Sequence, residues 1–123
     1  MDLINKEASF NKSKQGDENE YIYQLASYKF DYVSMHLYRD GKIKKLTFKE
    51  AELLKLFCLF LNNILSREYL LKTIWGNDDY FLGRSMDVYI ARLRKYLKDD
   101  KSIAIVTFRS VGFKLEIKTR KTT

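Results

Sequence analysis

The segment 84–97 constrains the fold most, because its apolar residues recur at the three-to-four-residue spacing of an α-helix. Each helical residue advances about 100° around the axis. Measured from Val88, four apolar side chains fall within about 40° of the opposite side. They are Met86, Ile90, Leu93 and Leu97. This pattern predicts a helix over residues 85–98 whose narrow apolar stripe docks on other elements of the domain.

The opposite face of the predicted helix is basic, with small residues between its cations. The residues within about 60° of Val88 are Arg84, Ser85, Ala91, Arg92 and Lys95. Small side chains would let such a helix approach base edges in a DNA major groove. We expect Arg92 to donate to guanine and Val88 to contact a thymine methyl group. Arg84 and Lys95 are expected to bind phosphates. The alternative is the solvated face of an ordinary amphipathic helix.

The net charge of +7 arises entirely after residue 83. Residues 1–83 contain 12 basic and 12 acidic side chains, whereas residues 84–123 contain 11 basic and 4 acidic ones. Such a positive region attracts polyanions, and nucleic acid is the commonest because each neutralised phosphate releases counterion. A solubilising surface or a basic tail is the alternative interpretation.

Strand patterns flank the helical part of the chain. Residues 21–46 are rich in aromatic residues that partly alternate, which predicts three or four short antiparallel strands. Asp40-Gly41 predicts a type I′ hairpin turn. After the basic helix, residues 103–108 and 113–117 predict a second hairpin. Its tip carries Arg109, with Thr107 beside it, and would lie against a minor groove or backbone as a wing.

Two further helices are predicted between these strands. Thr47-Phe48-Lys49-Glu50 is a capping box that starts a helix to about Leu61, whose apolar second half predicts burial. Ser66 caps a second helix over 67–75, and Gly76 ends it. Residues 76–83 are then predicted to form a loop.

Composition sets the boundaries and excludes several classes of protein. Residues 1–20 are polar and predict a flexible arm, residues 21–118 a single domain, and residues 119–123 a basic tail. One cysteine and one histidine offer no disulfide, metal site or catalytic triad, so we expect neither a cofactor nor an enzyme. The apolar stretch 56–61 is far shorter than the ~20 residues of a membrane span, and no secretion signal is visible. We therefore expect a cytoplasmic protein that does not associate with membranes.

Four segments carry a recognisable pattern in a fixed order. They are Leu46-Thr47-x-x-Glu50-x-x-Leu53-Leu54, Ser66-Arg67-Glu68-x-Leu70-x-x-x-Ile74-Trp75-Gly76, Arg84-Ser85-Met86-Asp87-Val88-x-Ile90-x-x-Leu93-Arg94-Lys95-x-Leu97, and Ile105-x-Thr107-x-Arg109-x-x-Gly112-Phe113. Together they resemble the C-terminal winged-helix effector domain of OmpR/PhoB-type response regulators. The resemblance covers about residues 22–117.

The resemblance implies an α+β winged helix-turn-helix, with an N-terminal β-meander, three helices and a C-terminal hairpin. It implies that helix 85–98 is the recognition helix and that 103–117 is the wing. The positions that match family DNA contacts are Arg84, Val88, Arg92, Arg94, Thr107 and Arg109. Tyr89 stands where the family often has a histidine that can touch phosphate. For Arg94, which lies off the outer face, we expect a phosphate contact or a structural role, such as pairing with an acidic neighbour.

The resemblance also implies partners. The loop 76–83 matches the family's transactivation loop, so RNA polymerase would meet Asn77, Asp78, Asp79, Tyr80 and Phe81. Family members bind direct repeats as tandem pairs, so we expect a monomer that becomes a tandem dimer on double-stranded DNA. No receiver domain is present in the chain, which suggests an effector domain from a longer parent protein.

One departure from the family pattern concerns the wing, where Ser110 replaces a glycine and predicts a different tip because serine tolerates positive φ less well. The alternative function is a winged-helix protein-interaction module whose basic face meets an acidic partner.

Overall fold

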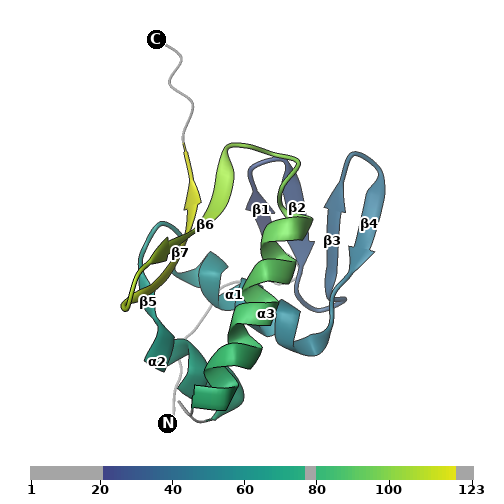
Figure 1. The fold of residues 1–123 in the computed structure, drawn as a ribbon. Helices are drawn as coiled ribbons and strands as arrows, with labels where there is room; N and C mark the ends of the chain where they lie inside the picture. The colour runs from purple at the N-terminus through teal and green to yellow at the C-terminus, as the bar shows by residue number, and fades with distance from the viewer. Residues whose placement is uncertain (1–20, 77–79, 119–123) are drawn as a thin grey trace, which may run out of the picture.

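The computed structural model describes residues 21–76 and 80–118, with the side chains of residues 80–82 excepted. The predicted arm 1–20 and tail 119–123 therefore lie outside the described residues. Figure 1 shows a central helix, α3, between two sheets: the strands β1 to β4 lie on one side, and β5, β7 and β6 on the other. This arrangement is the predicted winged helix-turn-helix with its N-terminal meander.

The N-terminal sheet is the four-stranded antiparallel meander that the aromatic pattern predicts. Its strands are β1 (Ile22–Leu25), β2 (Tyr28–Asp31), β3 (His36–Arg39) and β4 (Lys42–Lys45), paired in that order. Asp40 and Gly41 join the last two strands with φ of 52° and 78°. Two successive positive φ values are the signature of a type I′ turn, so this prediction is confirmed.

Helix α1 (Phe48–Leu59) begins where the capping box predicts. The Thr47 hydroxyl accepts from the Glu50 backbone N–H, and the Glu50 carboxylate accepts from the Thr47 backbone N–H. The helix buries Leu53, Leu54 and Phe57 completely. It ends two residues before Leu61, and Leu59 is 56% exposed, so the prediction that the whole second half is buried is wrong for its last turn.

The second helical segment consists of α2 (Arg67–Leu70) and the continuous π-helical turns of η2 (Leu71–Trp75). Ser66 caps it by accepting from the Tyr69 backbone N–H, and Gly76 ends it at φ 81°. Both ends match the prediction. Leu70 and Leu71 are buried against the rest of the core.

Helix α3 (Tyr80–Tyr96) begins five residues earlier and ends two residues earlier than predicted. The predicted loop 76–83 is therefore wrong for residues 80–83, which are helical. Gly83 lies inside the helix, where one glycine costs only about 1 kcal/mol. Here the glycine permits a close contact, because a Cβ atom at this position would lie 3.1 Å from Arg67 Nη2.

The C-terminal hairpin consists of β6 (Ile103–Phe108) and β7 (Gly112–Ile117), as predicted, and the short strand β5 (Leu65–Ser66) pairs with β7. A Cβ atom on Gly112 would lie 1.9 Å from the Leu65 carbonyl oxygen, so only glycine fits there. At the wing tip Ser110 has φ 64°, so the left-handed conformation forms with serine in place of glycine.

Candidate nucleic-acid interface

The two-sided helix that the sequence predicts is present in α3. Its inward side chains Met86, Ile90 and Leu93 are at most 2% exposed, and so is Leu97 directly after the helix. On the opposite side Val88 is 49% exposed. The packed stripe fixes the rotation of α3, and the predicted reading face is consequently directed to solvent.

This outer face has the predicted basic character. Arg84, Ala91, Arg92 and Lys95 are exposed, and Ser85 is half-buried. The side chain of Lys95 makes no hydrogen bond, ion pair or ring contact within the described residues. Small residues and cations therefore share one accessible strip along the helix.

Arg92 is held in place from two directions. Its guanidinium lies 4.9 Å from the ring centroid of Tyr89, and its Nη1 lies 3.5 Å from Glu50 Oε2. Its side chain remains 46% exposed. The cation is thus oriented by the protein while its outer part stays accessible.

Glu50 is the buried centre of this arrangement, and sequence reasoning identified only its capping role. Oε1 accepts from the Thr47 backbone N–H at 2.9 Å, and Oε2 accepts from the Tyr96 hydroxyl at 3.0 Å. Burial, together with the hydrogen bond to this carboxylate, raises the pKa of Tyr96. The i, i+4 spacing of Arg92 and Tyr96 was the available signal, since it places both side chains on the flank of α3 that faces α1.

Arg94 connects α3 to the wing. Its Nε and Nη2 donate to the Ile105 carbonyl at 3.0 and 2.9 Å, and Nη2 also donates to the Thr107 hydroxyl at 2.6 Å. The structural role among the predicted alternatives is present, but the acidic partner is wrong, because a carbonyl and a hydroxyl accept these bonds. Arg94 and Thr107 both belong to the predicted DNA-binding set, and here they hold each other.

Tyr89 and Asp87 connect α3 to the preceding helix. The Tyr89 ring packs edge-on against Trp75, with ring centroids 5.7 Å apart. Asp87 accepts from Arg67 Nη1 at 2.9 Å, and Arg67 Nη2 donates to the Gly83 carbonyl at 3.4 Å. Tyr89 is half-buried, so an accessible part of it borders the reading face.

The wing carries the remaining predicted residues. Thr107 and Arg109 are exposed, and Val111 at the tip is 53% exposed. The turn closes with a hydrogen bond from the Val111 N–H to the Phe108 carbonyl at 2.8 Å. The Arg94–Thr107 hydrogen bond joins the hairpin to α3, so the exposed surface of the helix continues onto β6.

The predicted polymerase-contact residues are only partly described. Asn77, Asp78 and Asp79 lie outside the described residues. Tyr80 and Phe81 belong to the first turn of α3 and not to a loop, as the corrected helix boundary requires.

Among the described residues, no group of three or more histidine, cysteine or acidic side chains is placed to hold a metal ion. Burial raises the pKa of the Cys58 thiol, which disfavours the reactive thiolate. In residues 21–76 and 80–118, no helix is both long and apolar enough to span a bilayer.

Comparison with known proteins extends these observations. The family described as "Transcriptional regulatory protein, C terminal" matches residues 41–115. The transcriptional regulatory protein RprY of Bacteroides fragilis is 47% identical over 104 residues, which is 85% of this chain and 44% of RprY. The chain thus spans less than half the length of that relative.

Two solved structures show the same arrangement of elements. The DNA-binding domain of CpxR from E. coli has a TM-score of 0.70 at 24% identity, over 80% of this chain and 98% of that domain, and supports the fold alone. The DNA-binding domain of RstA from Klebsiella pneumoniae, solved in complex with the RstA box, has a TM-score of 0.65 at 28% identity. That match covers 77% of this chain and 96% of the RstA domain.

Proposed function

The chain belongs to the family of transcriptional regulatory protein C-terminal domains, the OmpR/PhoB-type DNA-binding domains of response regulators, and on this basis we propose how it reads DNA. In this proposal α3 lies in the major groove of a specific double-stranded site. The β6–β7 wing lies on the adjacent minor groove or backbone. The observation that carries the proposal is the exposed strip of Val88, Arg92 and Lys95 opposite the fully buried stripe of the same helix.

Each outward side chain has a role that follows from its chemistry. Arg92 donates to guanine O6 and N7, a contact worth roughly 1–3 kcal/mol of discrimination. Val88 contacts a thymine methyl group, while Ser85 and Ala91 let the helix approach the bases. The phosphate contacts come from Arg84, Tyr89, Lys95 and Arg109.

Arg94 and Thr107 act together in this proposal. Their mutual hydrogen bond fixes the distance between the reading helix and the wing. Free N–H groups of the guanidinium and the exposed side of Thr107 then face the backbone between the two elements. The pair positions the wing and contributes to the phosphate contacts.

The further partners follow from family membership. We assign RNA polymerase to the residues around Asn77 and Asp79, and a receiver domain to the longer parent protein, since the chain spans 44% of RprY. The domain is monomeric alone and binds direct repeats as a tandem dimer about one helical turn apart. The activity takes place in the cytoplasm, and it includes no catalytic step.

A selection experiment tests the proposal. The chain is incubated with a library of random-sequence duplexes, and the bound fraction is sequenced. A DNA reader enriches one motif and prefers it to scrambled duplex by ~10³-fold or more. The alternative, a module for an acidic protein partner, binds duplexes weakly and without sequence preference, and that result would contradict the proposed function. The comparisons do not favour this alternative.

A further inference from the structure

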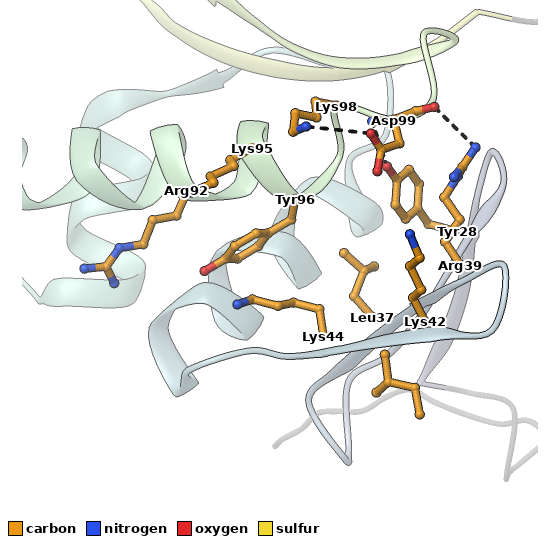
Figure 2. A pocket seen from close by; sticks show the side chains of 11 residues that line it. Tyr28, Leu37, Arg39, Lys42, Lys44, Arg92, Lys95, Tyr96, Lys98 and Asp99 are labelled. Atoms are coloured by element: carbon orange, nitrogen blue, oxygen red, sulfur yellow. Dashed lines mark hydrogen bonds and ion pairs between the residues drawn. The ribbon is translucent and has the colours of Figure 1, made fainter.

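A cationic cleft lies between the C-terminal half of α3 and the inner face of the N-terminal sheet (Figure 2). Its volume is about 490 Å³, and its floor includes Tyr28, Leu37 and Tyr96. The cations that line it are Arg39, Lys42, Lys44, Arg92, Lys95 and Lys98, and its only carboxylate is Asp99. Six cations against one carboxylate make this hollow strongly attractive to anions.

Two of these cations occupy positions where a sheet normally places core residues. Lys44 pairs with Leu37, which pairs with the fully buried Phe30. Cross-strand partners share one face of a sheet, and alternation places Lys42 on the same face as Lys44. Of the three lysines in the edge strand β4, Lys42 and Lys44 therefore face α3 and not the open side of the sheet.

The cations of the cleft are poorly neutralised. The side chains of Lys42 and Lys95 make no hydrogen bond, ion pair or ring contact within the described chain. Lys44 lies over the Tyr96 ring at 4.7 Å, and Lys98 lies 3.8 Å from Asp99, between side chains that are both well exposed. The two arginines are the exceptions, because Ser27, Asp40 and the Asp99 carbonyl engage Arg39, and Glu50 pairs with Arg92. The cleft consequently presents several cations that lack a protein counter-charge.

Arg92 and Lys95 belong both to this cleft and to the reading face of α3. A duplex on that face consequently brings its backbone to the mouth of the cleft. We propose that the cleft binds phosphates of the same duplex through Lys42 and Lys44, and so extends the DNA footprint to the side of α3 away from the wing (Figure 1). The inference rests on the proposed function, since it takes α3 as the reading helix.

Phosphate is the anion that the arrangement favours. Flexible lysines bind phosphate oxygens as point charges and need no fixed geometry. Inward lysines on an edge strand also hinder pairing with another sheet, which is a different reason for their presence. The test therefore needs a measurement that depends on phosphate binding and is unaffected by protection of the edge strand.

The double variant Lys42→Gln/Lys44→Gln (the Gln/Gln variant) removes both of these charges from the cleft without removing buried apolar area. The matched control is Lys29→Gln/Lys45→Gln, which removes two charges from the other face of the same sheet, where Lys29 lies over the Tyr38 ring. Lys42→Arg/Lys44→Arg restores the charge. Circular dichroism melting checks that all three proteins are folded.

Binding to a duplex selected by the wild-type chain is measured as a function of KCl concentration. Each phosphate contact contributes about 0.9 to the slope of log K against log salt. We expect the Gln/Gln variant to lose about 1–2 from this slope, the arginine variant to keep it, and the control to change it by less than about 0.5. Phosphate-ethylation interference should lose signals on one flank of the site in the Gln/Gln variant alone.

An unchanged slope and an unchanged interference pattern in the Gln/Gln variant would overturn the inference and leave the proposed function intact. Self-association of that variant with an unchanged slope would overturn it in favour of edge protection. Failure of the wild-type chain to select any motif would instead contradict the proposed function on which the inference depends.

Discussion

Glu50 Oε2 lies 3.5 Å from Arg92 Nη1 and joins the cap of α1 to the exposed face of α3. Only the acid is buried, with 2% of its side chain exposed against 46% for Arg92. The same oxygen accepts from Tyr96, one turn further along α3. One buried carboxylate therefore determines where α1 begins and where the central cation of the reading face lies.

Replacing Glu50 should destabilise the domain by an amount that depends on what replaces it. Glu50→Ala leaves the Thr47 N–H and the Tyr96 hydroxyl without their acceptor and opens a cavity, so we expect a loss of about 2–4 kcal/mol. Glu50→Gln keeps the side-chain shape and the acceptor for Thr47, and should lose about 1–2 kcal/mol. Urea unfolding followed by circular dichroism measures both. Equal losses in the two variants would show that the carboxylate charge matters, and that neither the side-chain shape nor the retained acceptor does.

Local signals in the sequence predicted most of the fold, because each was a short-range pattern with a physical cause. The capping box, the Asp40-Gly41 turn and the apolar stripe of α3 all depend on residues within a few positions of one another. The predicted start of α3 is five residues too late. The close approach of Gly83 to Arg67 depends on how the helices pack, and no local pattern shows it.

The site was predicted by residue type, but its internal contacts were not. The outward positions of Val88 and Lys95 follow from helical geometry alone. The partners of Arg92 and Arg94 lie on α1 and β6, 42 and 11 residues away for Glu50 and Ile105. Such pairs depend on how the elements pack, which a pattern along the chain does not contain. The inward lysines of β4 were missed for the same reason.

Arg92→Ala should reduce discrimination more than it reduces general affinity. If Arg92 donates to guanine, the loss is roughly 1–3 kcal/mol on the selected duplex, with relaxed preference at one base pair. Arg92→Lys is the matched variant, because it keeps the charge but loses the two-pronged donor geometry. Fluorescence anisotropy with the selected duplex and with versions substituted at single base pairs gives the ratio. A ratio unchanged in both variants would remove Arg92 from the reading set.

Lys95→Ala should weaken binding to all duplexes alike. Its ammonium has no protein partner in the described chain, so its removal costs no internal contact. We expect the slope of log K against log salt to fall by about 1, with an unchanged preference for the selected duplex. Salt titrations on selected and scrambled duplexes measure both quantities. A base-specific loss would instead place Lys95 in the groove.

Arg94→Ala should destabilise the connection between α3 and the wing. It removes three hydrogen bonds from a charged donor on a partly exposed side chain, for an expected loss of about 1–2 kcal/mol. Thr107→Val removes only one of them and keeps a strand-forming residue, so we expect about 0.5–1 kcal/mol. Urea unfolding measures the stabilities, and amide hydrogen exchange shows whether the stability is lost locally in β6. Exchange that is unchanged in β6 would contradict the role of Arg94 in holding the wing.

Acid should weaken the domain partly through Asp100, which joins the turn after β1 to the turn after α3. Its carboxylate accepts from the Ser27 N–H and from both the N–H and the hydroxyl of Ser102. These hydrogen bonds hold the pKa of Asp100 well below its ordinary value of 3.8. A lowered folded-state pKa contributes stability that is fully present above the unfolded value and is lost as the pH falls below it.

Asp100→Asn should therefore lower the free energy of unfolding at neutral pH and flatten its decline below about pH 4, relative to the wild type. Urea unfolding at a series of pH values compares the two proteins, with Asp99→Asn as the neighbouring control. Parallel pH profiles for wild type and Asp100→Asn would show that this carboxylate does not contribute to acid sensitivity.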